Sequence, residues 1–246
     1  MSKQGRRESA AARAAEIRAK QEAAERRRRS LVIAGIVAAI VLIIGGGFLI
    51  QNLRDTSDKA ATPPAGVTDT YGILVGDASA PKTVQIYADF QCPVCQLFEQ
   101  GAGEQLSKAV ADKKIKIDYR MVAFLDGQSS TDYSSRALNA AAVVLDQSGV
   151  DAFVKFHDLL YANQPKEGSS GLSDKQLIEY AVEAGADEAA VTPGIKDRSF
   201  KQWAINATDQ ASKNGVTGTP TVFIDGKKIE GKTIDDIVTQ TLAGIS

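Results

Sequence analysis

The sequence predicts an α/β domain that carries an inserted helical subdomain and is preceded by a single transmembrane helix. Three observations lead to this fold class. Residues 31–50 form an unbroken apolar run, and β-rich segments with alternating polarity follow at 83–88 and 114–122. The next β-rich segment begins at Thr221, and 98 residues separate it from Val122. A crossover between parallel strands needs only about a dozen residues or somewhat more, so this gap indicates a helical insertion.

Charge divides the chain into a basic tail and an acidic remainder. Residues 1–29 hold ten basic and four acidic residues, a net of +6, so the remainder must carry −7 to give the total of −1. This balance excludes a strongly basic nucleic-acid-binding domain for most of the chain. A composition of 43% hydrophobic and 24% charged residues also excludes wholesale disorder.

The apolar run is expected to anchor the chain in the cell membrane as a single pass. At about 1.5 Å per residue, its 20 residues span the roughly 30 Å hydrocarbon core. A cleaved signal peptide usually has an apolar stretch of only about 7–15 residues after a short basic lead, so an uncleaved anchor is favoured. The positive-inside rule places the tail of residues 1–30 in the cytoplasm and everything after Gln51 outside. The tail suits either contact with anionic membrane lipid or plain solvation.

A linker separates the span from the folded domain. Residues 51–68 are mostly polar and contain Pro63-Pro64, which interrupts any helix. The domain then comprises residues 69–246, long enough to bury a substantial core, with the helical insertion at about 126–213.

Alternation and helical spacing place the individual elements of the domain. Pro93 is tolerated in the first turn of a helix, and the Asp225-Gly226 pair predicts the tight turn of a β-hairpin. The expected strands are 71–75, 83–88, 114–122, 221–224 and 227–230. The expected helices are 93–111, 132–147, 151–161, 174–184, 196–213 and 233–243.

The two cysteines of the chain stand together as Cys92-Pro93-Val94-Cys95, at the junction of an expected strand and an expected helix. A disulfide across two residues constrains the unfolded chain little, so reactivity explains the pair better than stability does. At a helix start, orphan N–H groups and the helix dipole favour the thiolate of Cys92. Pro93 removes one such donor and Val94 adds no cationic side chain, so both residues tune the site.

A metal centre and a bound cofactor are not expected. A structural zinc site needs four ligands, whereas the chain offers two cysteines and one histidine, His157. His157 lies on a helix rich in Phe and Leu, and we expect a packed, hydrogen-bonded core residue. Trp203 is expected in the core as well.

The motif and its surroundings resemble the membrane-anchored, DsbA-type thiol–disulfide oxidoreductases of the thioredoxin-fold family. The resemblance covers about residues 70–245 and implies a thioredoxin-like core with an inserted helical subdomain. Four segments carry the resemblance. They are VGD at 75–77 followed by AP at 80–81, YADFQCPVC at 87–95 followed by FE at 98–99, Phe153 followed by FHDLL at 156–160, and GVTGTPT at 215–221.

The resemblance implies a role for each matching residue. Cys92 is the exposed sulfur that exchanges with substrate, and Cys95 is the buried resolving sulfur. Pro220 is in the cis form and faces the cysteine pair, while the backbone of Thr219 pairs with an extended substrate. Glu99 matches a charged position one or two helical turns below the active site.

One departure from the family pattern concerns proton transfer. Many relatives carry a buried carboxylate six residues before the first cysteine, where this sequence has Ile86. The acid–base assistance that such a carboxylate gives to the resolving cysteine is therefore missing at this position.

The expected activity is thiol–disulfide exchange on reduced or misoxidised exported proteins outside the cytoplasm, most simply disulfide formation at the Cys92–Cys95 pair. The resemblance implies a quinone-linked membrane thiol oxidase as the partner that reoxidises the pair. Two alternatives stay open: the same chemistry in the direction of a reductase or isomerase, and a membrane-anchored chaperone or scaffold without enzymatic activity.

Overall fold

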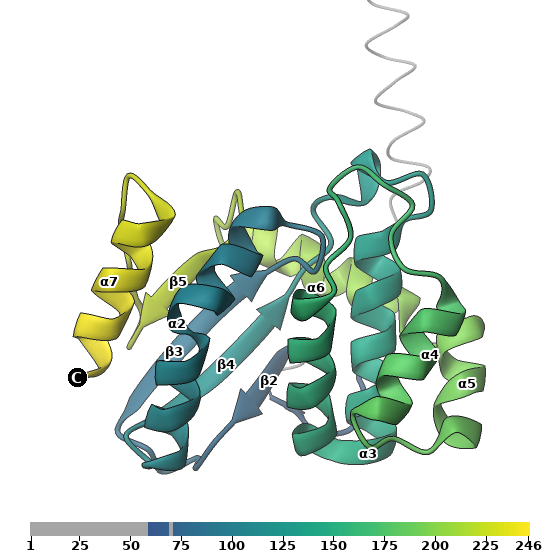
Figure 1. Ribbon diagram of the computed structural model, residues 1–246, viewed down its shortest axis with the longest axis horizontal. Coiled ribbons are helices and arrows are strands. Elements are labelled where there is room, and N and C mark those ends of the chain that lie inside the picture. The colour runs from purple at the N-terminus through teal and green to yellow at the C-terminus, as the bar shows by residue number, and fades with distance from the viewer. Residues whose placement is uncertain (1–58, 69–70) are drawn as a thin grey trace, which may run out of the picture. The chain divides into compact units, whose positions relative to one another are not determined.

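The computed structural model describes residues 59–68 and 71–246, which form a six-stranded sheet with helices on both faces and a helical insertion (Figure 1). The strands are β1 (Val67–Thr68), β2 (Gly72–Val75), β3 (Lys82–Ala88), β4 (Ile115–Met121), β5 (Thr221–Ile224) and β6 (Lys227–Lys228). The helices are α2 (Pro93–Ala111), the short 3₁₀ helix η1 (Asp126–Gln128), α3 (Tyr133–Ala162), α4 (Asp174–Glu183), α5 (Glu188–Lys196), α6 (Lys201–Lys213) and α7 (Ile234–Ile245). The expected α/β core with a helical insertion is confirmed.

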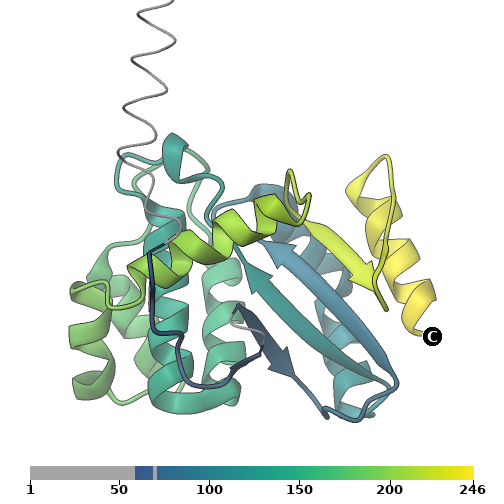
Figure 2. The same ribbon diagram turned by 180° about the vertical axis from the view of Figure 1, so that it is seen from behind.

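The sheet has the order β1-β2-β4-β3-β5-β6. Its central pair, β3 and β4, is parallel, and Ile86 lies opposite Tyr119 in the register; α2 is the crossover between these two strands. β2 and β5 add to this pair in antiparallel fashion. Helices α2 and α7 cover one face of the sheet, and α6 crosses the other, as the reverse view shows (Figures 1 and 2).

The buried side chains explain why α2 lies on the sheet. Phe98, Ala102 and Leu106 recur at four-residue intervals and are all buried, so they form one apolar face. Gly101 lets α7 approach closely, because a Cβ atom at this position would lie 3.1 Å from a methyl group of Val238. The fit of α2 between the sheet and α7 fixes the orientation of its first turn.

The insertion begins with α3, which contains two helical halves joined at Gly149. The backbone of Gly149 has φ 81° and ψ −178°, a conformation that other residues rarely adopt, and it redirects the chain there. The two expected helices, 132–147 and 151–161, are thus confirmed as the two halves.

The insertion differs from the expected elements in two places. α5 lies in a segment where no element was expected, and it forms although Pro193 and Gly194 disfavour a helix interior. The helix expected from residue 196 begins only at Lys201, because Arg198 has a φ of 54° and interrupts the chain between α5 and α6.

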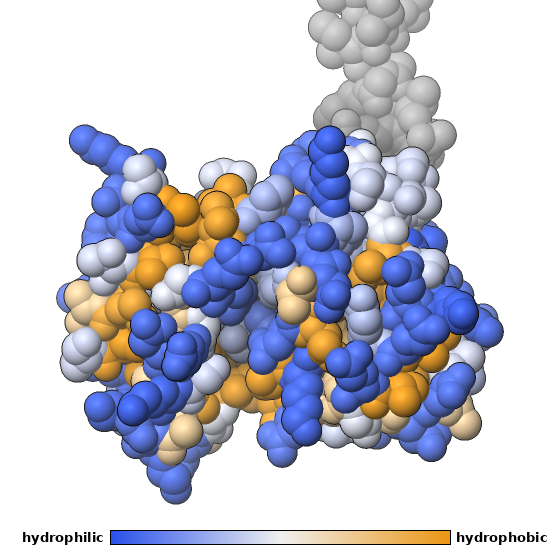
Figure 3. Space-filling model, viewed as in Figure 1, coloured by the Kyte–Doolittle hydropathy of each residue, from blue (hydrophilic) through white to orange (hydrophobic). Residues whose placement is uncertain are grey.

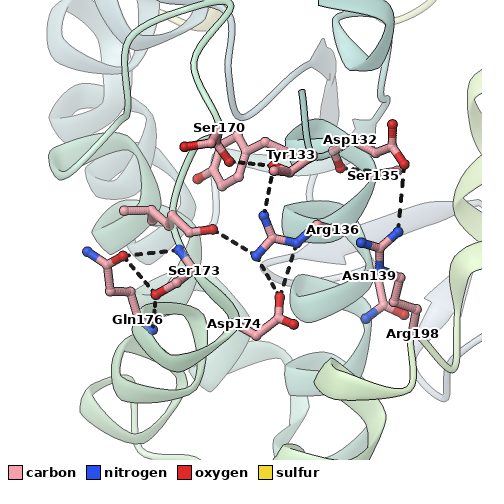
Figure 4. A network of polar contacts seen from close by, with 12 residues as sticks. Asp132, Tyr133, Ser135, Arg136, Asn139, Ser170, Ser173, Asp174, Gln176 and Arg198 are labelled. Atoms are coloured by element: carbon pink, nitrogen blue, oxygen red, sulfur yellow. Dashed lines mark hydrogen bonds and ion pairs between the residues drawn. The ribbon is translucent and has the colours of Figure 1, made fainter. Parts of the chain in front are cut away.

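The loop between α3 and α4 is held by the Arg136 guanidinium (Figure 4). Arg136 donates to Asp174 Oδ1 at 2.6 and 3.0 Å and to the Leu172 carbonyl at 2.8 Å. It also donates to Thr131 Oγ1 at 3.2 Å. The side chain of Arg136 is 8% exposed, so the charge-assisted bonds replace its lost hydration and fix the loop against α3.

The hairpin near the C-terminus has the expected turn. Asp225 and Gly226 both have positive φ, 48° and 78°, which matches the twist of a tight two-residue hairpin. Its second strand, β6, is shorter than expected and comprises Lys227 and Lys228, after which the Ile229 N–H still donates to the Val222 carbonyl of β5 at 2.8 Å.

The N-terminal limit of the sheet differs from the expected one. Val67 and Thr68, placed at the end of the expected 51–68 linker, pair with β2 as an edge strand. Upstream of them, the Lys59 carbonyl accepts a hydrogen bond from Asn206 at 2.8 Å.

The expected basic tail and the expected span at 31–50 lie outside the described residues. In residues 59–68 and 71–246, no helix combines the length and apolarity needed to span a bilayer.

Candidate active site

The two cysteines lie at the start of α2, directly after β3. Cys92 is the N-cap residue, in extended backbone conformation, and Pro93 occupies the first helical position. The two cysteines are not joined by a disulfide in this structure. Cys95 is 1% exposed and Cys92 is 7% exposed, so Cys92 is the more accessible of the pair but is more shielded than the sequence suggested.

The surroundings move the pKa values of the two thiols in opposite directions. A hydrogen bond from the Cys95 thiol lowers the pKa of Cys92 to about 6, against desolvation; the Thr219 side chain and the N–H groups of Cys95 and Val94 add to this effect. Burial, followed by the interaction with Cys92, raises the pKa of Cys95 well above its ordinary value. Lowering a thiol pKa from 9.0 to about 6 takes roughly 4 kcal/mol, and a helix dipole supplies about 2 kcal/mol at most. Direct donors to the Cys92 sulfur therefore supply the remainder.

The loop before β5 forms the opposite wall of the site. The Thr219-Pro220 peptide bond is cis, as the resemblance implied. The Cys92 Sγ donates to the Thr219 carbonyl oxygen at 3.4 Å. Thr219 and Pro220 are both half-buried, and the hydroxyl of Thr221 closes the turn by donating to the Gly218 carbonyl at 2.7 Å.

Three apolar side chains on the first two turns of α2 are exposed to solvent. Pro93 is exposed, Val94 is 42% exposed and Leu97 is 49% exposed, although each is apolar. Apolar surface also gathers beside α2 and α7 on the face seen in Figure 3. Such a patch beside a reactive group suits the binding of an apolar, unfolded chain.

A buried carboxylate, Asp89, organises the turn before Cys92. It accepts hydrogen bonds from the backbone N–H of Gln91 at 2.8 Å, from that of Leu125 at 3.0 Å, and from the hydroxyl of Ser134 at 2.6 Å. Burial raises the pKa of Asp89 to about 6, although these three donors act in the opposite direction. Asp89 thereby joins the active-site turn to the helical insertion.

The end of α3 is hydrogen-bonded to the same turn. Gln164 donates to the carbonyl oxygens of Phe90 and Cys92, at 3.1 and 3.0 Å. The hydroxyl of Tyr161 donates to the Asp89 carbonyl at 3.2 Å, and Gln96 donates back to the Tyr161 carbonyl at 2.7 Å. The helical insertion therefore fixes the backbone on which the reactive sulfur sits.

Glu99 lines a cleft of about 690 Å³ between α2 and the second half of α3, and its Oε1 lies 3.7 Å from Nε2 of His157. The Glu99 side chain is 12% exposed, and burial raises its pKa. His157 is 1% exposed, as expected of a core residue, and its Nδ1 lies 3.1 Å from Asp158 Oδ1. Trp203, at 2% exposed, is also in the core.

The structure thus brings together Cys92, Cys95, Pro93, Val94, Thr219 and Pro220, and it places Glu99 one helical turn below Cys95. Sequence reasoning missed Asp89 and Gln164. The available signal for Asp89 was a carboxylate three residues before the first cysteine. The hydrogen bonds of Gln164 cross 72 or more residues of chain, so no local pattern indicates them.

Comparisons with known proteins agree with this geometry. A family model described as thioredoxin matches residues 68–242. The reduced disulfide bond oxidoreductase DsbG from Mycobacterium tuberculosis is 32% identical with a TM-score of 0.61, covering 78% of this chain and 92% of that chain. Reduced DsbA from the same organism is 31% identical with a TM-score of 0.58, covering 71% and 99%. The serine/threonine-protein kinase PknE of that organism is 32% identical over 165 residues, 64% of this chain but only 29% of the kinase.

The chain belongs to the thioredoxin family and, within it, to the DsbA-type thiol–disulfide oxidoreductases. It spans under a third of the kinase, so that similarity concerns this domain alone.

Proposed function

We propose that this protein introduces disulfides into reduced, exported polypeptides from a membrane anchor, with its catalytic domain outside the cytoplasm. The observation that carries the proposal is the opposite shift of the two thiols: the pKa of Cys92 falls to about 6 while that of its buried neighbour Cys95 rises. This asymmetry suits one sulfur for exchange with substrate and the other for resolution.

The proposed reaction begins with the Cys92–Cys95 disulfide. A substrate thiolate attacks Cys92 Sγ, the bond between the two cysteines breaks, and the electron pair leaves on Cys95. A second substrate thiolate then attacks the mixed disulfide, which releases oxidised substrate and leaves both enzyme cysteines reduced. A quinone-linked membrane thiol oxidase is proposed to accept the two electrons and restore the disulfide.

The low pKa of Cys92 supports the oxidising direction. At pH 7, lowering a thiol pKa from 9.0 to about 6 stabilises the reduced form by about 1.4 kcal/mol, which corresponds to about 30 mV of potential. A stabilised reduced form makes the disulfide a stronger oxidant. The exposed apolar residues Val94 and Leu97 and the backbone of Thr219 are proposed to hold an extended, unfolded substrate beside the sulfur.

The test is an equilibrium titration of the purified full chain against glutathione redox buffers. We expect a potential of roughly −120 to −200 mV, the range of oxidases and isomerases, and catalysis of disulfide formation in a reduced, unfolded ribonuclease. The Cys92→Ser/Cys95→Ser double variant should be inactive. A potential near about −270 mV would assign the reductase direction. Full assistance of the ribonuclease by the double variant would instead assign a chaperone.

A further inference from the structure

The cleft of about 690 Å³ lies along the flank of α2 that faces away from α7. α7 packs against α2 at Gly101, and the second half of α3 stands on the other side of α2 (Figure 1). Neither cysteine lines the cleft, and neither does Thr219. The residues that α2 contributes recur every three or four positions, as one helix face does: Gln96, Glu99, Gln100, Gly103, Glu104, Ser107, Val110 and Ala111.

The cleft combines apolar and acidic side chains. The apolar ones come from the sheet and from both helices: Val75, Val110, Ile117, Tyr119 and Val154. Three exposed carboxylates also line it, those of Glu104, Asp151 and Asp158. Lys155 is the only cationic side chain among the lining residues that the structure describes. Negative charge therefore predominates beside an apolar surface, and this combination is complementary to a cation that carries apolar neighbours.

Glu99 is the most deeply buried carboxylate of this lining. Its side chain is 12% exposed, compared with 67% for Asp158. Glu99 Oε1 is buried and has no hydrogen-bond partner among the described residues, because the nearby His157 Nε2 is 3.7 Å away. Burial above all, with a smaller effect from Asp158, raises the pKa of Glu99. A buried carboxylate without a donor is costly, so a ligand that brings a positive charge and N–H donors is favoured here.

The grouping of the carboxylates and the length of the cleft narrow the choice of ligand. In residues 59–68 and 71–246, no three His, Cys, Asp or Glu side chains are grouped as they are around a metal ion. An ammonium or guanidinium group needs only one or two carboxylates. From Gln96 to Ala111, α2 rises about 22 Å, a length that about seven residues of an extended chain also span. An elongated cleft of this kind suits a polypeptide segment better than a compact molecule.

We propose that the cleft binds an extended polypeptide segment in which a lysine or arginine side chain lies among apolar ones. The cation pairs with Glu99 and Asp158, and the apolar side chains cover the floor. Gly103 leaves room for the segment, since a Cβ atom there would meet only Glu99 Oε2, at 3.4 Å. This site is non-covalent and does not use the cysteines, so it adds a second binding surface to the proposed thiol–disulfide exchange.

Fluorescence anisotropy of a dye-labelled peptide without cysteine measures the binding. The purified full chain is titrated into Val-Thr-Lys-Thr-Val-Thr-Val, which presents the lysine and three valines on one face when it is extended. A second peptide has glutamate in place of the lysine, and we expect it to bind at least about tenfold more weakly. Glu99→Gln should weaken binding of the lysine peptide about 10- to 100-fold, because a charge-assisted hydrogen bond is lost.

Gly103→Leu tests the cleft without removing a charge. The leucine side chain occupies the space that the peptide needs, so binding should fall at least about tenfold. Leucine is also a better helix former than glycine, so the urea midpoint should stay at or above that of the natural protein. Two exposed residues of the last two turns of α2 and its C-cap, both outside the cleft, supply matched controls. Gln105→Leu and Asp112→Asn should each leave the affinity within about twofold.

Three results overturn the proposal. They are equal affinity for the lysine and glutamate peptides, natural affinity in both Glu99→Gln and Gly103→Leu, and a self-association of the full chain that Gly103→Leu removes. The last would assign the cleft to a second copy of the chain. The Cys92→Ser/Cys95→Ser variant should bind the lysine peptide as the natural protein does. A natural protein that binds the peptide but does not oxidise reduced ribonuclease would lose the proposed function and keep this site, and the opposite result would remove this site alone.

Discussion

The thiol of Cys92 donates a hydrogen bond to the backbone carbonyl of Thr219, 3.4 Å away and 127 residues later in the chain. The carbonyl accepts from the thiol but offers no donor to the thiolate. Besides this carbonyl, the Thr219 side chain lowers the pKa of Cys92, after the Cys95 thiol and ahead of the N–H groups of Cys95 and Val94, so both the helix and the loop before β5 stabilise the thiolate.

This arrangement predicts an order of reactivity. In reduced protein, a limiting alkylating agent should label Cys92 first, and the rate should rise with pH around a midpoint near 6, because the thiolate is the reactive form. Mass spectrometry of tryptic peptides measures both sites. Preferential labelling of Cys95 would reverse the assigned roles.

The two sulfurs should also differ in the complexes that they trap. Cys95→Ala should accumulate mixed disulfides through Cys92, because the intramolecular attack that frees a bound partner is lost. Cys92→Ala should trap little, since Cys95 is 1% exposed. Pro220→Thr should prolong the complexes as well, because it places an N–H group and a branched side chain beside the sulfur.

Non-reducing gels of membranes from cells that express each variant show these complexes as slow, thiol-sensitive bands. The Cys92→Ala/Cys95→Ala double variant is the control for bands that arise elsewhere. Absence of such bands from folded Cys95→Ala and Pro220→Thr would favour the anchored chaperone.

The orientation of the chain can be tested separately. Ten basic residues precede the apolar run at 31–50, whereas only Arg54 and Lys59 lie in the 20 residues after it. We therefore expect the C-terminus outside the cytoplasm. A reporter that is active only in the cytoplasm, fused after Ser246, should be silent. A strong signal would contradict both the topology and the proposed site of action.

Asp89 should make stability depend on pH in a particular direction. Its folded pKa, about 6, lies above the ordinary 3.8, so the folded state binds this proton more tightly than the unfolded state does. The contribution of this proton to stability is complete below about pH 4 and is lost as the pH rises through 6; its size is roughly 3 kcal/mol.

Urea unfolding at pH 4, 5, 6 and 7 measures this dependence. Asp89→Asn should have a flatter profile between pH 4 and 6 than the natural protein, while Asp235→Asn, which removes an exposed carboxylate on α7, should keep the natural slope. An unchanged slope in Asp89→Asn would assign the titration to another group.

Gln164 should contribute to stability through the active-site turn. Gln164→Ala removes two hydrogen bonds and leaves the carbonyls of Phe90 and Cys92 without this donor, which should cost about 1–3 kcal/mol. Asn163→Ala is a neighbouring control, because the Asn163 side chain bonds only the Leu159 carbonyl of its own helix. Equal losses in the two variants would show that Gln164 has no special role.

Much of the fold could be predicted because its signals are local. Alternation located β3 and β4, and the Asp225-Gly226 turn located the hairpin. α5 escaped because Pro193 and Gly194 are read as a turn, whereas packing of Val191 and Ile195 in the core overrides that preference. β1 could not be predicted, because two residues are too few to show the alternation of polar and apolar side chains that marks a strand.

The residues of the candidate site also fall into those that local motifs predict and those that only tertiary contacts place. The cysteines and Pro220 stand in motifs that can be read along the chain. The roles of Asp89, Gln164 and His157 depend on contacts between segments that are far apart, and a single sequence carries no pattern for such contacts.

The distance along the chain between Cys92 and Thr219 also has a consequence for biosynthesis. In the proposed topology the domain crosses the membrane from its N-terminal side onward, so Cys92 and Cys95 reach the outside before the Thr219 loop that covers them. Until β5 pairs with β3, Cys92 and Cys95 are two reduced cysteines of an unfolded chain, and a folded copy of the enzyme could oxidise them. A newly exported chain would thus be a substrate of the folded copies that preceded it.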